Sequence, residues 1–105
     1  MQIEFQTDNV TLTKDLEDYI KLHLGFDESG QYDQVKYVLV KLSEVEDEKG
    51  NKRQNCYVTV ELEGIPTHID VQNTEEDIHY AIDLAAKRAR KTALLWLRRY
   101  GAKSA

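Results

Sequence analysis

The pattern of apolar and polar residues predicts one long amphipathic helix over residues 74–105. Its apolar side chains recur at steps of three and four, the spacing of one helix face, and they are Ile78, Ile82, Ala85, Ala89, Ala93, Trp96 and Tyr100. Thr74 and Asp77 have the spacing of a capping box, which places the helix start at Thr74. The apolar stripe must face a core, so the opposite side of this helix is expected to face solvent.

A shorter helix and four strands are predicted before it. The helix begins after its N-cap, Thr13, and continues to Leu24, where Gly25 is expected to end it in a left-handed conformation. A polar loop follows over residues 25–34. The strands are recognised by apolar and polar residues that alternate, and they cover residues 2–6, 35–45, 55–63 and 65–72. Gly50 marks the tip of a hairpin between the second and third strands.

The order β-α-β-β-β-α predicts an α+β fold, a two-layer sandwich. Three consecutive strands joined by short turns form an antiparallel meander, and the first strand is expected to join them in one four-stranded sheet. Two amphipathic helices without another partner are expected to pack on one face of that sheet. A chain of 105 residues is expected to form a single domain over residues 1–105.

Composition narrows the classes of protein that remain. Hydrophobic content of 41% with 31% charged residues excludes a disordered chain. No apolar stretch approaches the roughly 20 residues of a membrane span, and the N-terminus lacks a signal-peptide pattern. The one cysteine, Cys56, fits a reducing compartment, and we expect a cytoplasmic protein.

Charge is distributed unevenly along the chain. Residues 1–73 hold seven Lys or Arg against fifteen Asp or Glu, whereas residues 74–105 hold seven against four. From Leu84 onward there are seven basic residues and no acidic one. Because affinity follows local potential, this helix is suited to a polyanion although the formal net charge is −5.

Catalytic and metal chemistry is not indicated. The three histidines fall on different elements, and no Cys or His has metal-ligand spacing. Cys56 alternates with Val58 and is expected to be buried. Tyr57 and Tyr80 could stack on nucleic-acid bases, but on a half-exposed strand or helix we expect them to pack. We therefore expect no enzyme activity, no cofactor and no small-molecule substrate.

Three segments carry a resemblance to a known family. They are Asn9–Thr13 (NVTLT), Thr67–Gln72 (THIDVQ) and Glu76–Arg90 (EDIHYAIDLAAKRAR). Together with the order of elements, they resemble the short form of the ribosome hibernation promoting factors, also called ribosome-associated inhibitor A or sigma-factor modulation proteins. The resemblance implies a translation inhibitor that binds the small ribosomal subunit under stress, in the channel used by messenger and transfer RNA.

On this interpretation, basic side chains of both helices bind phosphates of ribosomal RNA. The candidates are Lys87, Arg88, Arg90, Lys91, Arg98 and Arg99 on the long helix and Lys14 and Lys21 on the short one. The alternative for the same residues is an ordinary solvated helix face.

The end of the long helix departs from the family pattern. On a helical wheel Leu94, Leu95 and Leu97 point away from the apolar stripe. They either form an exposed patch for a protein partner or a homodimer, or they are covered by the 25–34 loop. A second function therefore stays open, that of a protein-interaction or homodimerisation module with the same fold that no longer binds the ribosome.

Overall fold

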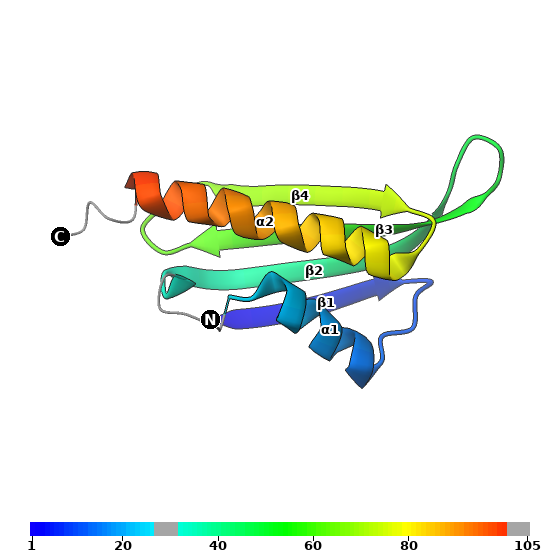
Figure 1. Ribbon diagram of the computed structural model, residues 1–105, viewed down its shortest axis with the longest axis horizontal. Coiled ribbons are helices and arrows are strands. Elements are labelled where there is room, and N and C mark those ends of the chain that lie inside the picture. The colour runs from blue at the N-terminus through cyan, green and yellow to red at the C-terminus, as the bar shows by residue number, and fades with distance from the viewer. Residues whose placement is uncertain (27–31, 101–105) are drawn as a thin grey trace.

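The computed structural model describes residues 1–26 and 32–100, within which the chain forms four strands and two helices (Figure 1). In chain order the elements are β1 (Gln2–Asp8), α1 (Lys14–Leu24), β2 (Val35–Glu46), β3 (Lys52–Leu62), β4 (His68–Glu75) and α2 (Ile78–Tyr100). This order confirms the predicted β-α-β-β-β-α arrangement and the α+β class. The predicted helical end at 101–105 and residues 27–31 of the predicted loop lie outside the described residues.

The strands form one sheet in the order β1-β2-β3-β4. β1 runs parallel to β2, and the next two pairings are antiparallel, so the predicted meander and the joining of the first strand are confirmed. Figure 1 shows both helices in front of the same face of the sheet. There α2 packs on β3 and β4, and α1 packs beside α2.

The hydrophobic core fills the space between the sheet and the helices. From Cys56 onward every second side chain of β3 is buried, as the alternation predicted; these are Cys56, Val58, Val60 and Leu62. The buried stripe of α2 is mostly small; it comprises Ala81, Ile82, Ala85, Ala86, Ala89, Ala93 and Leu97. Small side chains let this helix approach the sheet closely. Because this stripe faces β3 and β4, the polar residues on the opposite side of α2 face solvent.

Helix α1 begins and ends as its sequence predicted. The Thr13 hydroxyl oxygen accepts the backbone N–H of Leu16 at 3.1 Å, which satisfies one of the free donors of the first turn. Gly25 follows the last helical residue with φ of 65°, and its N–H donates to the Lys21 carbonyl at 3.1 Å. Leu16 and Ile20, on the core-facing side of this helix, are buried.

The predicted start of α2 at Thr74 was wrong. Thr74 is still part of β4 and pairs with Asn55 of β3, and its hydroxyl donates to the Asn55 side chain at 2.8 Å. The helix is capped instead by Asp77, whose Oδ2 accepts the backbone N–H of Tyr80 at 3.1 Å. Strand pairing outweighs the local capping signal here, because β4 pairs with β3 through residue 75 and hydrogen-bonds the backbone groups that it turns toward that strand.

The predicted strand start at residue 65 is also too early. Gly64 adopts φ of 78°, and the Ile65 N–H donates to the Leu62 carbonyl at 3.3 Å, which makes this segment a turn. Pro66 lacks a donor for the ladder, and pairing with β3 begins only at His68.

The prediction that Leu97 points away from the core was wrong. It is 7% exposed and belongs to the core, together with Phe26 and Tyr32 from the edges of the segment predicted as a polar loop. The rings of Phe26 and Tyr32 lie 5.1 Å apart between centroids. Leu94 is partly buried against the core, so among the three leucines only Leu95, at 60%, is mainly exposed.

Candidate nucleic-acid interface on helix α2

Three basic side chains form a row along the solvent side of α2: Lys87, Lys91 and Arg98, here called the outer basic row. Steps of four and seven residues place them on the same side of a helix. All three are exposed, on the side opposite the buried stripe. The row follows from the amphipathic pattern, since packing the apolar stripe on β3 and β4 turns these positions outward.

No acidic residue of α2 follows Asp83 to oppose this row. The remainder of α2 carries six Lys or Arg residues and no Asp or Glu. Within the described part of the chain, neither the outer basic row nor Arg99 forms an ion pair with a carboxylate. Arg98 and Arg99 occupy the last turn, where the partial negative charge of the helix end favours cations. This surface can therefore meet a polyanion with several cations at once.

The other two predicted arginines of α2 make contacts within the protein. Arg88 donates from Nη1 to the backbone oxygen of Gln72 at 3.0 Å and to Oδ1 of Asn73 at 3.3 Å, both on β4. On the other flank, Arg90 donates to the backbone oxygen of His23 at 3.3 Å, in the last turn of α1. These bonds connect α2 to its two neighbours, and RNA binding by either arginine stays a prediction.

The two predicted lysines of α1 are exposed and also have partners. Lys14 Nζ is 2.7 Å from Oδ1 of Asp18, and the hydrogen bond and charge of Asp18 raise the pKa of Lys14. Lys21 Nζ lies 6.0 Å from the centroid of the Phe5 ring. Because α1 packs beside α2, both lysines belong to the same layer as the outer basic row. Their part in RNA binding stays a prediction.

A shallow depression of about 450 Å³ lies at the C-terminal end of α2. It is lined by Leu95, Trp96, Arg98, Arg99 and Tyr100. Tyr100 is 47% exposed, and its ring meets that of Trp96 edge to face with centroids 5.7 Å apart. The depression thus combines apolar and aromatic surface with two guanidinium groups.

Tyr80 is an exposed aromatic side chain that was expected to pack. It is 53% exposed, near the start of α2. Its position seven residues before Lys87 puts it on the same side as the outer basic row. Its spacing from the basic residues, not its spacing from the apolar stripe, is the sequence signal that shows Tyr80 to be exposed.

The most acidic segment lies away from the C-terminal half of α2. Glu46, Asp47 and Glu48 belong to the hairpin between β2 and β3. Figure 1 shows its tip (green) projecting from the end of the molecule where α2 begins, whereas the last turns of α2 lie at the other end. Backbone N–H donation from Asn51 and Lys49 lowers the pKa of Asp47. Asp47 is therefore held in its charged form, at the other end of the molecule from the last turns of α2.

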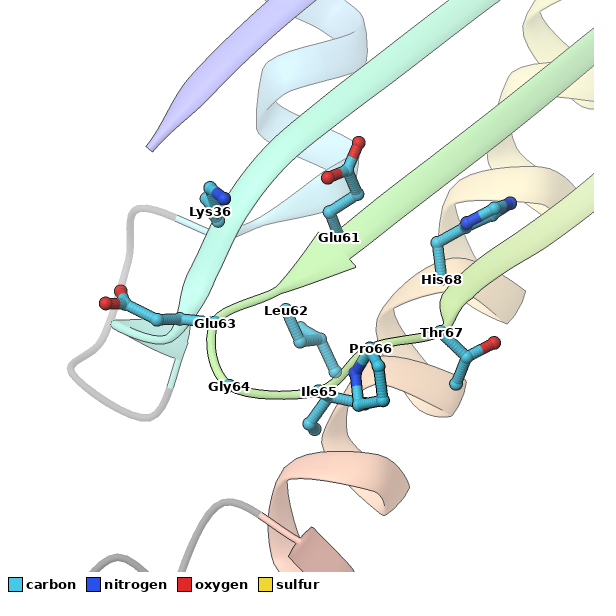
Figure 2. A pocket seen from close by; sticks show the side chains of 9 residues that line it. All are labelled: Lys36, Glu61, Leu62, Glu63, Gly64, Ile65, Pro66, Thr67 and His68. Carbon is cyan, nitrogen blue, oxygen red and sulfur yellow. The ribbon is translucent and has the colours of Figure 1, made fainter.

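A second depression, at the turn between β3 and β4, has mixed charge. Figure 2 shows the Glu61 and His68 side chains on one side of the sheet and Leu62 on the other. His68 Nε2 lies 3.3 Å from Oδ2 of Asp70. Among the described residues, no group of three or more His, Cys, Asp and Glu is placed to hold a metal ion.

Comparison with known protein families gives a match over nearly the whole chain. The sequence profile described as Sigma 54 modulation protein / S30EA ribosomal protein matches residues 3–100. The chain belongs to this family. The match covers both helices and all of the sheet except Gln2, and it confirms the family resemblance found in the sequence. The family is one of ribosome-associated proteins, which gives this protein a ribosome-related role. Comparison with curated protein sequences gives no significant match.

Two solved structures share the fold over nearly their whole length. A ribosomal subunit interface protein from Coxiella burnetii superposes with a TM-score of 0.71 at 18% identity, covering 97% of this chain and 99% of the other. The N-terminal domain of Protein Y from Thermus thermophilus gives 0.72 at 22% identity, covering 91% and 99%. No helix within residues 1–26 and 32–100 is both long and apolar enough to cross a membrane.

Proposed function

We propose that this protein binds the small ribosomal subunit in the cytoplasm and occupies the channel used by messenger and transfer RNA, which holds ribosomes inactive under stress. Membership of a family of ribosome-associated proteins supports the ribosomal partner. The observation that carries the RNA contact is the outer basic row, Lys87, Lys91 and Arg98, exposed on α2 with no acid after Asp83 on the same helix.

Phosphate contact accounts for affinity without sequence reading. Each lysine or arginine that meets a phosphate releases condensed counterions, so binding weakens as salt rises. Folded RNA is recognised mainly through its shape, phosphates and 2′-hydroxyls, which suits a rigid helical surface. The acidic hairpin at Glu46–Glu48 must then face away from the RNA, and its place at the other end of the molecule from the last turns of α2 permits this.

Co-sedimentation with purified small subunits at low and raised salt tests the proposal. The test variant is Lys87→Glu, Lys91→Glu and Arg98→Glu together. The matched control carries the same change of net charge on β2 and its hairpin, at the exposed residues Lys36, Lys41 and Lys49.

We expect salt-sensitive binding of the natural protein, loss of binding in the α2 variant and retention in the control. Equal binding by all three proteins would exclude the outer basic row as the contact. Absence of binding by the natural protein at every salt concentration would exclude the ribosomal function itself.

A second candidate function is protein interaction or homodimerisation, favoured by the 60% exposure of Leu95. Sedimentation velocity over a range of protein concentrations tests it beside a Leu95→Ser variant. A concentration-dependent dimer that this variant abolishes would support the second function. A monomer at all concentrations would exclude the homodimer.

A further inference from the structure

We propose that the depression at the end of α2 binds one unpaired RNA base, packed against Tyr100 and Trp96, with neighbouring phosphates on Arg98 and Arg99. This inference rests on the proposed RNA-binding function and adds a base-stacking contact to its phosphate contacts. It also assigns a role to the aromatic end of the helix, which phosphate binding alone does not use.

The lining of the depression matches the two parts of a nucleotide. The exposed Tyr100 ring, with Trp96 in edge-to-face contact behind it, offers a flat apolar surface for a base. Arg98 and Arg99 line the same depression and can each bind a phosphate through two parallel N–H groups. Leu95 adds apolar surface at the rim. The depression thus places an aromatic surface for a base beside guanidinium groups for phosphates.

Continuity with the outer basic row places this site on the path of an RNA strand. Arg98 belongs both to the row and to the lining of the depression. Trp96 and Tyr100 belong to the apolar stripe, on the other side of α2 from Lys87 and Lys91. A strand whose phosphates follow the row therefore reaches the rings by crossing over Arg98 at the end of the helix. Because bases in a duplex are already stacked on each other, only a loop, bulge or end can insert one here.

Charge favours RNA over a second copy of this chain as the occupant. Two copies that met at this depression would bring Arg98 and Arg99 of each toward those of the other, and like charges across an interface are unfavourable. No acid after Asp83 on α2 could offset them.

Tryptophan fluorescence can report directly on this site, because Trp96 is the only tryptophan of the chain. The protein is titrated with a single-stranded oligoadenylate of about ten nucleotides, and separately with a blunt-ended, fully paired RNA duplex of the same charge. We expect saturable quenching of Trp96 by the oligoadenylate and little by the duplex. Equal responses to both RNAs, or none to either, would overturn the stacking site.

Substitutions at Tyr100 test whether its aromatic ring contributes to RNA binding. Tyr100→Leu should weaken oligoadenylate binding about tenfold, while Tyr100→Phe should retain it, since the ring and not the hydroxyl carries the contact. Circular dichroism checks that both variants fold. Unchanged affinity of Tyr100→Leu would contradict the proposal. A Trp96 emission shift that depends on protein concentration without RNA would indicate a second copy in the depression and would equally overturn it.

The same variants keep this inference distinct from the proposed function. Suppose that the natural protein binds small subunits, and that Tyr100→Leu has the same affinity as the natural protein for both small subunits and oligoadenylate. The stacking site is then wrong and the ribosomal function stands. If oligoadenylate quenches Trp96 but small subunits are never bound, the stacking site stands and the ribosomal function is wrong.

Discussion

The hydroxyl of Tyr19 donates a 2.6 Å hydrogen bond to Oδ1 of Asp83, and this bond joins α1 to α2. Nδ1 of His23 lies 3.4 Å from the same oxygen, and its ring is 4.2 Å from that of Tyr19 between centroids. His79 meets the Tyr19 ring edge-on at 4.7 Å. A polar cluster therefore holds the two helices together beside their apolar contact.

Removal of the Tyr19 hydroxyl should loosen this junction. A hydrogen bond to a charged group is worth about 1.5–3 kcal/mol, and partial exposure of Asp83 reduces this through solvent screening. We expect Tyr19→Phe to lower the free energy of unfolding by about 1 kcal/mol. Urea denaturation measures the change, with Tyr37→Phe as control, since Tyr37 makes a like bond to Glu4 in an exposed position. Equal losses in both variants would contradict a special role of the junction.

The same bond should make stability depend on alkaline pH. The hydrogen bond to Asp83, then burial, raises the pKa of Tyr19 from 10.0 to about 12. Only the neutral hydroxyl can donate, so its contribution is complete below the unfolded value and is lost as pH rises from about 10 through about 12. Absorbance titration of tyrosinate should show one late step in the natural protein that Tyr19→Phe lacks. If both proteins titrate alike, Tyr19 is not the shifted group.

The sequence predicted those parts of the fold that depend on local period. Thr13 and Gly25 delimit α1 because the cap, the apolar face and the left-handed glycine agree within one segment. The start of α2 was missed because Thr74 satisfies a local capping rule while its backbone is paired to Asn55 of β3. That pairing joins residues far apart in sequence, which a local signal cannot reveal.

Asp77, and not Thr74, should therefore control the stability of α2. Loss of an N-cap costs about 1 kcal/mol, and Asp77 Oδ2 accepts the Tyr80 N–H. We expect Asp77→Ala to lower the free energy of unfolding by about this amount, measured by urea denaturation. Thr74→Ala loses only an exposed bond to Asn55 and should have a smaller effect. The reverse ranking would restore Thr74 as the cap.

The candidate site was predictable along the helix but not on its flanks. Lys87 and Lys91 lie opposite the apolar stripe, so the helical period alone turns them outward. Arg88 and Arg90 flank the stripe, and there the hydrogen-bond acceptor depends on which element packs beside that flank. The acceptor of Arg88 lies on β4, and the acceptor of Arg90 lies at the end of α1.

Arg90 and Lys91 are neighbours that should have separable effects. Arg90→Gln removes the bond to the His23 carbonyl and should cost about 0.5–1 kcal/mol of stability. If Arg90 only joins α2 to α1 and does not contact RNA, the salt dependence of ribosome binding by Arg90→Gln should equal that of the natural protein. Lys91→Gln should leave stability unchanged and reduce the slope of log affinity against log salt by about 1. Denaturation and binding at several salt concentrations measure both. A reduced slope for Arg90→Gln would place its guanidinium on RNA.

The thiol of Cys56 should be unreactive until the sheet opens. It is 1% exposed on β3, and burial raises its pKa to about 12. The thiolate is the reactive form, so at about pH 8 both its scarcity and its burial protect it. We expect alkylation of the folded protein to proceed only through unfolding and to be immediate in denaturant. Mass spectrometry follows the rate, which should rise about fivefold in Tyr19→Phe if about 1 kcal/mol of stability is lost, because the open population depends exponentially on stability. Rapid alkylation of the folded natural protein would show that Cys56 is accessible without unfolding.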